Sequence, residues 1–170
     1  MSIQAKVINK VGDDISTDII YPGRFMATVL PTETPLYAFA DQEEFNKLLN
    51  SKNYPPNSVL LGGKNFGCGS SREQAASTLH GHGLIVVAKH FARIFLQNSI
   101  NLGLRTIICP EIEASEGDLL EIMENQIINK TTGKTFEIEP LPKARQVIVD
   151  AGGLVNYTQK RLLEKHGIKK

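Results

Sequence analysis

The chain has 170 residues, a length that fits one domain with a self-sufficient core. Its formal net charge is +1, with 41% apolar and 22% charged residues, so bulk electrostatics does not draw it to nucleic acid or to an anionic membrane. No apolar stretch approaches the roughly 20 residues of a membrane helix, and the first residues lack a signal-peptide pattern. We therefore expect a cytoplasmic protein in which residues 1–170 form a single domain.

The chain contains two cysteines, Cys68 and Cys109, far apart in the sequence. An iron–sulfur cluster or a structural zinc site needs about three or four soft ligands, usually with CxxC-like spacing. We therefore expect no metal centre in this chain, and two lone cysteines in a reducing compartment are more often core residues than a disulfide. The histidines at 80, 82 and 90 lack an acidic third ligand nearby, which favours hydrogen-bonding or helix-end roles.

The chain before residue 117 predicts strands that alternate with helices. In chain order, the expected elements are a strand at 3–9, a packed loop at 15–23, an excursion at 30–56 with one helix at 41–49, a strand at 59–61, a helix from 70 or 71 to about 81, a strand at 84–88, a helix at 91–102 and a strand at 106–109. Strand–helix–strand–helix–strand with short connections favours right-handed crossovers and a parallel sheet.

After residue 117 the pattern becomes antiparallel. The expected elements are strands at 119–123, 126–130 and 134–138, followed by helices at about 143–151 and 155–166. The expected fold class is therefore mixed α/β, with a parallel βαβαβ core and an antiparallel β appendage.

The segment from Gly67 to Glu73, which reads Gly-Cys-Gly-Ser-Ser-Arg-Glu, holds the most informative side chains. Its glycines allow a tight turn, and a helix start adds free N–H donors. Ser70 and Glu73 have capping-box spacing, so the helix is expected to begin at Ser70 or Ser71. Such a helix start favours an anion, and Arg72 can hold a carboxylate or phosphate with two hydrogen bonds. On the residues alone, an ordinary N-cap with a surface arginine stays open.

Three other motif classes fail on spacing. A dinucleotide fingerprint needs a third glycine where Arg72 stands, and an acidic residue after the next strand, where the chain has Ala-Lys-His at 88–90. A P-loop needs Gly-Lys-Ser/Thr, which the segment from Gly67 to Glu73 lacks. A hydrolase elbow needs GxSxG, and neither Ser70 nor Ser71 lies between two glycines with that spacing. Recognition of a small anion remains.

The same segment resembles the swivelling domain of the aconitase superfamily. The resemblance rests on Gly-Ser-Ser-Arg-Glu at 69–73, on Lys-His-Phe-Ala-Arg-Ile-Phe at 89–95 with Asn98, and on Gly-Asp-Asp-Ile-Ser-Thr-Asp-Ile-Ile at 12–20 followed by Pro-Gly-Arg at 22–24. It implies the swivelling β/β/α fold. Residues 12–20 and 22–24 are similar to the N-terminal signature of the free-standing small subunits of the superfamily, so the resemblance also implies such a subunit. This domain is a separate chain in isopropylmalate dehydratases and prokaryotic homoaconitases and is fused to the catalytic portion in aconitases.

The resemblance also implies a role for each matching residue. Ser70 matches the serine that, as its alkoxide, removes the proton from the substrate carbon. Ser71 and Arg72 match groups that bind a substrate carboxylate, and Asp18 matches an active-site aspartate with a supporting role. The family's [4Fe–4S] cluster belongs to the large subunit, so this chain is expected to be active only together with that partner.

Members of the family distinguish substrates with the loop after the Pro-Gly-Arg segment. Enzymes for citrate- and homocitrate-type substrates place an arginine there, whereas this loop reads Phe-Met-Ala-Thr-Val-Leu at 25–30. We expect Ala27 and Thr28 to contact an alkyl branch, because an apolar lining leaves a third carboxylate unpaired at high cost. The implied reaction is the isomerisation of 2-isopropylmalate to 3-isopropylmalate by loss and readdition of water, a step toward leucine. The alternatives are a dehydratase for homoaconitate-, dimethylmalate- or methylmalate-type substrates and a non-catalytic carboxylate-binding module.

Overall fold

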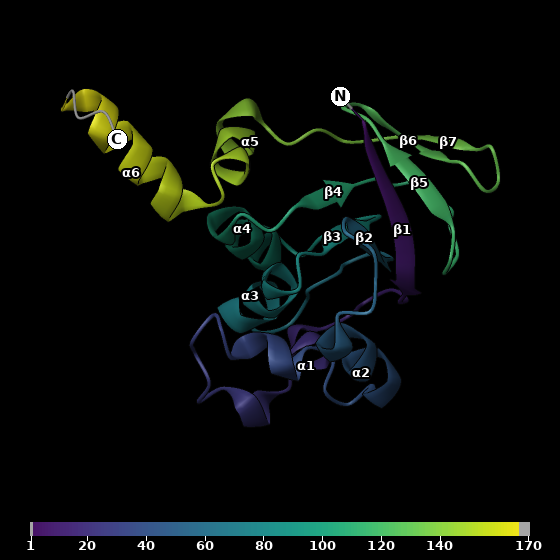
Figure 1. Cartoon of the computed structure of the whole chain (residues 1–170), viewed down its shortest axis with the longest axis horizontal. Coiled ribbons are helices and arrows are strands. Elements are labelled where there is room, and N and C mark those ends of the chain that lie inside the picture. Colours follow the sequence, from purple (N-terminus) through teal and green to yellow (C-terminus); the bar gives the residue numbers. More distant parts are fainter. Residues whose placement is uncertain (1, 167–170) are drawn as a thin grey trace.

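The computed structural model describes residues 2–166 (Figure 1); residues 1 and 167–170, which belong to the expected domain, lie outside this range. Its seven strands form one sheet in the order β4-β3-β2-β1-β5-β6-β7. The strands are β1 (Ile3–Lys10), β2 (Ser58–Gly62), β3 (Ile85–Ala88), β4 (Thr106–Ile108), β5 (Leu119–Ile122), β6 (Gln126–Asn129) and β7 (Thr135–Glu137). The α-helices are α1 (Thr17–Ile20), α2 (Glu43–Ser51), α3 (Glu73–Gly81), α4 (Arg93–Leu102), α5 (Lys143–Asp150) and α6 (Leu154–Lys165), and the 3₁₀ helices are η1 (Gly23–Phe25) and η2 (Thr34–Tyr37).

Strands β2 to β4 form the predicted parallel core, and β1 extends it by pairing in parallel with β2. Every residue of β2 and β3 is buried, as expected for strands that are covered on both faces. Helices α3 and α4 pack against each other and lie along one face of this part (Figure 1). The apolar cluster between them and the sheet includes residues Leu60, Ala76, Leu79, Val86 and Phe95.

Strands β5, β6 and β7 form the predicted antiparallel unit, which joins the sheet through an antiparallel pairing of β5 with β1. The sheet curls so far that the chain just after β7 reaches β4. There the backbone N–H of Glu139 donates to the carbonyl of Ile108 at 2.9 Å. The thiol of Cys109 donates to the carbonyl of Glu137 at 3.2 Å. A second apolar cluster, on the sheet face away from α3 and α4, fills this curl with Val7, Val59, Leu61, Val87, Leu120 and Ile127.

Helix α3 begins at Glu73, later than predicted, and the expected capping box between Ser70 and Glu73 does not form. The carbonyl of Ser70 accepts a hydrogen bond from Thr17 Oγ1, and that of Ser71 accepts one from Asn98 Nδ2, both at 3.2 Å. A helix that began at Ser70 would need these carbonyls for its own hydrogen bonds. The two serines therefore lie in an extended segment that precedes the helix.

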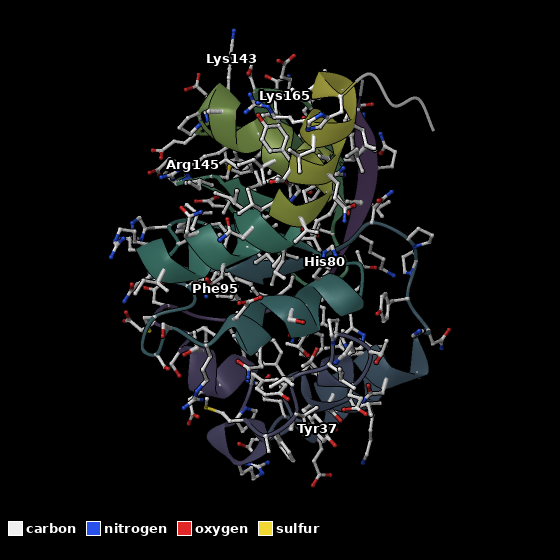
Figure 2. All side chains as sticks on the ribbon, turned by 90° about the vertical axis from the view of Figure 1, so that its left-hand side faces the viewer. Tyr37, His80, Phe95, Lys143, Arg145 and Lys165 are labelled. Carbon is white, nitrogen blue, oxygen red and sulfur yellow. The ribbon has the colours of Figure 1, made fainter. Side chains whose placement is uncertain are left out.

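The C-terminal helices lie at the other end of the molecule from the excursion before β2 (Figures 1 and 2). In Figure 2, Lys143, Arg145 and Lys165 mark the end with α5 and α6, and Tyr37 of η2 marks the opposite end. No helix within residues 2–166 is both long enough and apolar enough to cross a bilayer.

Candidate active site

The loops that follow β1 and β2 are joined by main-chain hydrogen bonds. Because the two strands are parallel, their carboxyl ends lie at the same edge of the sheet. The N–H of Gly67 donates to the carbonyl of Ile15 at 2.7 Å, and the N–H of Thr17 donates to the carbonyl of Cys68 at 2.8 Å. This short parallel pairing places α1 directly beside the segment that contains Ser70.

The loop that follows β3 is joined to the same segment. The N–H of Phe66 donates to the carbonyl of His90, and the N–H of Ala92 donates to the carbonyl of Phe66, both at 2.9 Å. The rings of Phe66, Phe91 and Phe95 are buried together, with centroid separations of 5.4 to 6.1 Å. All three motifs that carry the family resemblance thus meet at one edge of the sheet.

Two acidic side chains fix the base of the loop after β2. Asp13 Oδ1 accepts from the N–H of Lys64 at 2.7 Å, and Asn65 Nδ2 donates to Asp14 Oδ1 at 2.8 Å. Further along, Gly67 has a φ of +81°, and an added Cβ would overlap the side chain of Phe95. The path of the chain toward Ser70 is therefore set by contacts on both of its sides.

Ser70 and Ser71 are both exposed, and within residues 2–166 neither hydroxyl has a hydrogen-bond partner. Their carbonyls, by contrast, are held by Thr17 and Asn98. The backbone under the two serines is fixed while both hydroxyls stay free to meet a ligand or a covering protein.

The Arg72 guanidinium is bound to the carboxylate of Asp18. Its Nη1 donates to Asp18 Oδ1 and to the carbonyl of Tyr21, the latter at 3.2 Å. The Arg72 side chain is only 16% exposed, whereas that of Asp18 is 64% exposed. Arg72 Nε is buried without a partner, and Nη2 has none within the described residues. Nη2 is therefore the nitrogen that remains for a substrate carboxylate.

Asp18 is held as an anion by its neighbours. The hydrogen bond from Arg72, and after it the N–H of Gly23 at 2.9 Å, keep the pKa of the Asp18 carboxyl below its usual value. Asp18 touches both the arginine and the first residue of η1. It therefore links the loop that holds Ser70 to the segment that continues toward Ala27 and Thr28.

Ala27 is exposed and Thr28 is half-buried, and both follow η1 in a segment with projecting apolar side chains. Met26, Val29 and Leu30 are 43%, 66% and 54% exposed. Gly23, at the start of this segment, lies against Arg72 and Asp18. The structure thus brings Asp18 to the segment of residues 70–72. It places Ala27 and Thr28 on the adjoining segment, and within residues 2–166 no hydrogen bond joins them to the two serines.

The described residues do not fit an iron–sulfur cluster or another metal centre. No group of three or more His, Cys, Asp or Glu side chains within residues 2–166 is arranged to hold a metal ion. Cys109 is buried, and burial raises the pKa of its thiol to about 11. The buried His82 lies with Nε2 2.8 Å from the carbonyl of Pro35, in the hydrogen-bonding role expected for it, and burial lowers its pKa.

Comparisons with known proteins agree with this arrangement. Residues 14–112 match the family model described as the aconitase C-terminal domain. The 3-isopropylmalate dehydratase small subunit of Thermodesulfovibrio yellowstonii is 42% identical over 167 residues, which cover 95% of this chain and 96% of the relative. The methanogen homoaconitase small subunit of Methanocaldococcus jannaschii is 41% identical, with 95% of each chain covered.

A solved structure extends the comparison to the fold. The crystal structure of a 3-isopropylmalate dehydratase from Methanocaldococcus jannaschii superposes with a TM-score of 0.87 at 39% identity, and covers 99% of this chain and 100% of that one. The sheet with its parallel and antiparallel parts is therefore shared. This chain belongs to the aconitase C-terminal domain family, together with the small subunits of the 3-isopropylmalate dehydratases.

Proposed function

We propose that the chain is the small subunit of a cytoplasmic hydro-lyase that isomerises 2-isopropylmalate to 3-isopropylmalate. In this proposal it forms one domain and supplies half of a composite active site to a large subunit with a [4Fe–4S] cluster. The observation that carries the proposal is the pair of exposed Ser70 and Ser71 hydroxyls, which have no hydrogen-bond partner within residues 2–166, beside Arg72, whose Nη2 also has none there. The relatives named as 3-isopropylmalate dehydratase small subunits support the same assignment.

The side chains of this site have separate roles in the proposed reaction. Arg72 Nη2 and the Ser71 hydroxyl bind a substrate carboxylate, while Asp18 holds Nη1 and so orients the guanidinium. In its alkoxide form, Ser70 accepts the proton from the substrate carbon while the hydroxyl on the adjacent carbon leaves as hydroxide, so that the substrate loses the elements of one water. Readdition of water with the two positions exchanged gives the isomer, and Ser70 returns a proton to carbon in that step.

The need for a partner follows from the free energy of serine activation. Each pKa unit takes about 1.4 kcal/mol, and a helix N-terminus contributes at most about 2 kcal/mol within its first turn. Ser70 lies before the first residue of α3, and the charge of Arg72 is shared with Asp18. Lowering the serine pKa by several units therefore requires a closed, dry site that faces charged groups of another protein.

The loop after η1 favours an alkyl branch over a third carboxylate. Arg24, the cation of the segment from residue 23 to 30, is occupied by Asp41 through a two-point contact: Nη2 to Oδ1 at 2.5 Å and Nη1 to Oδ2 at 3.1 Å. It also lies over the ring of Phe25, 4.6 Å from the centroid. Within residues 23–30 a homocitrate-type carboxylate would find no unpaired cation, which favours an alkylmalate over a homocitrate-type substrate. The preferred substrate is 2-isopropylmalate, and the alternatives are dimethylmalate and methylmalate, which carry smaller alkyl groups.

Reconstitution tests the proposal. The purified chain, a large iron–sulfur subunit and the mixture are each assayed for conversion of 2-isopropylmalate, with the unsaturated intermediate followed by its ultraviolet absorbance. We expect conversion in the mixture alone. Ser70→Ala should lower the rate in the mixture by about 10²–10⁴-fold, whereas Ser115→Ala, which changes an exposed serine outside the site, should not.

Three outcomes would count against the proposal. Conversion by the isolated chain would remove the need for a partner, and full activity of the Ser70→Ala mixture would remove the role of the serine. The third outcome is tight binding of dicarboxylates by the isolated chain, measured by calorimetry. Binding without a second protein would identify a carboxylate-binding module instead.

A further inference from the structure

Tyr21 contacts both halves of the proposed substrate site. It is completely buried and follows α1 directly. Its main-chain carbonyl accepts a hydrogen bond from Arg72 Nη1 at 3.2 Å. Its hydroxyl lies 3.1 Å from the carbonyl of Phe25 and 3.3 Å from that of Thr28, and donates its single hydrogen between them. Burial raises the pKa of the Tyr21 hydroxyl, so it stays protonated at neutral pH and remains a donor.

The loop that contains Ala27 depends strongly on this hydroxyl. Within residues 2–166, the Tyr21 hydroxyl is the one hydrogen-bond donor to the carbonyl of Thr28. Inside the loop, the N–H of Thr28 donates to the carbonyl of Phe25 at 2.9 Å, which closes a turn but does not attach that turn to the rest of the protein. Beyond Thr28, Val29 projects into solvent. Among the hydrogen bonds of residues 2–166, those of this hydroxyl therefore anchor the turn to the buried part of the protein.

Aromatic packing holds the same turn from its other side. The ring of Phe25 stacks on that of Tyr37 with centroids 4.2 Å apart and an interplanar angle of 16°. The Tyr21 ring meets both rings edge-on, at 6.5 Å and 6.2 Å. In Figure 2, Tyr37 lies at the end of the molecule away from α5 and α6. The three rings fix the start of the turn, whereas its end at Thr28 depends on the hydroxyl.

We infer that Tyr21 is a positioning residue that sets the alkyl selectivity of the site, by fixing the separation between Arg72 and residues 27–28. The inference rests on the proposed function, in which Arg72 binds a carboxylate and residues 27–28 meet the alkyl branch. A fixed separation suits one size of branch, because a larger or smaller branch fits only if the turn moves. Selectivity among alkylmalates therefore depends on a hydroxyl that does not touch the substrate.

Tyr21→Phe tests the inference because it removes the hydroxyl and keeps the ring packing and the carbonyl bond to Arg72. In the reconstituted complex, the preference for 2-isopropylmalate over 2-methylmalate, measured as the ratio of kcat/KM values, should fall roughly threefold to tenfold, the effect of one lost hydrogen bond. The change should appear in KM, with kcat for 2-isopropylmalate within about twofold of wild type. Tyr54→Phe is the matched control, since it removes a hydroxyl bonded to His82, outside the site.

Hydrogen exchange in the isolated chain provides a readout that does not depend on turnover. The amides of residues 25–28 should exchange faster in Tyr21→Phe than in wild type, and should be unchanged in Tyr54→Phe. Unchanged exchange would refute the anchoring, and faster exchange with an unaltered substrate preference would refute the role in selectivity. An equal shift of preference in Tyr54→Phe would also overturn it. If the wild-type complex converts neither alkylmalate, the proposed function fails and the selectivity inference falls with it, whatever the exchange data show.

Discussion

Replacing Gly67 with alanine tests whether contacts on both sides of the chain fix the loop that leads to Ser70. Gly67 has a φ of +81°, and placing an L-residue in that region costs roughly 1–2 kcal/mol. The new Cβ would also overlap the Cβ and ring of Phe95, a side chain that is 1% exposed. Overpacking of a buried contact typically costs about 1–3 kcal/mol. We therefore expect a loss of about 2–5 kcal/mol, a large share of the roughly 5–15 kcal/mol of a typical domain.

Gly69→Ala separates the two contributions. Gly69 has a φ of +94°, but an added Cβ would lie 3.6 Å from Thr17 Oγ1 and 3.7 Å from Ser16 Cβ, which are ordinary contacts. It should therefore lose only the conformational part, about 1–2 kcal/mol. Urea unfolding of the isolated chain measures both variants. Equal destabilisation would show that Phe95 does not restrict the loop, and would refute the reasoning.

Three further predictions concern single side chains. Ala27→Arg in the reconstituted complex should shift the preference toward homocitrate-type acids, and unchanged relative rates would contradict the loop assignment. In the native isolated chain, a thiol reagent should modify the half-buried Cys68 quickly and the buried Cys109, whose thiol pKa is raised to about 11, only after denaturation; rapid reaction of both would contradict the burial. Because Arg72 lowers the pKa of Asp18 below 3.8 in the folded chain, the stabilisation from this pair should be present above that pH and lost as the pH falls through the lowered value. The difference in unfolding free energy between wild type and Asp18→Asn should therefore shrink between pH 7 and pH 3, and a constant difference would argue against the pair.

The sequence predicted the sheet better than it predicted the start of α3. Buried apolar runs and the turns between them gave the parallel and antiparallel strands, because local patterns determine those elements. Ser70 and Glu73 have the spacing of a helix cap, yet Thr17 bonds to the carbonyl of Ser70 and Asn98 bonds to that of Ser71. Both donors are distant in the sequence, and their bonds keep the two serines out of the helix. The closure of the curl through Glu139 and Ile108 is equally non-local.

Parts of the site also lie beyond sequence reasoning. The motifs identified Asp18 and Arg72 separately, but not their contact, which joins residues 54 positions apart. Tyr21 was missed because its neighbours in the sequence predict only burial, and its hydroxyl bonds to main-chain carbonyls, which leave no sequence signature. Nothing next to Arg24 in the sequence indicates its pairing with Asp41, 17 positions away, which only the fold shows.

Exchange of the carbon-bound hydrogen of the substrate for solvent deuterium tests most directly the claim that Ser70 becomes a base only in the assembled enzyme. 2-Isopropylmalate is incubated in D₂O with the isolated chain, with the wild-type complex and with the Ser70→Ala complex, and deuterium on carbon is measured by mass spectrometry. The proposed role of Ser70 predicts deuterium with the wild-type complex, none with the isolated chain and at most a trace with Ser70→Ala. Incorporation by the isolated chain, or by the Ser70→Ala complex at the wild-type rate, would contradict it.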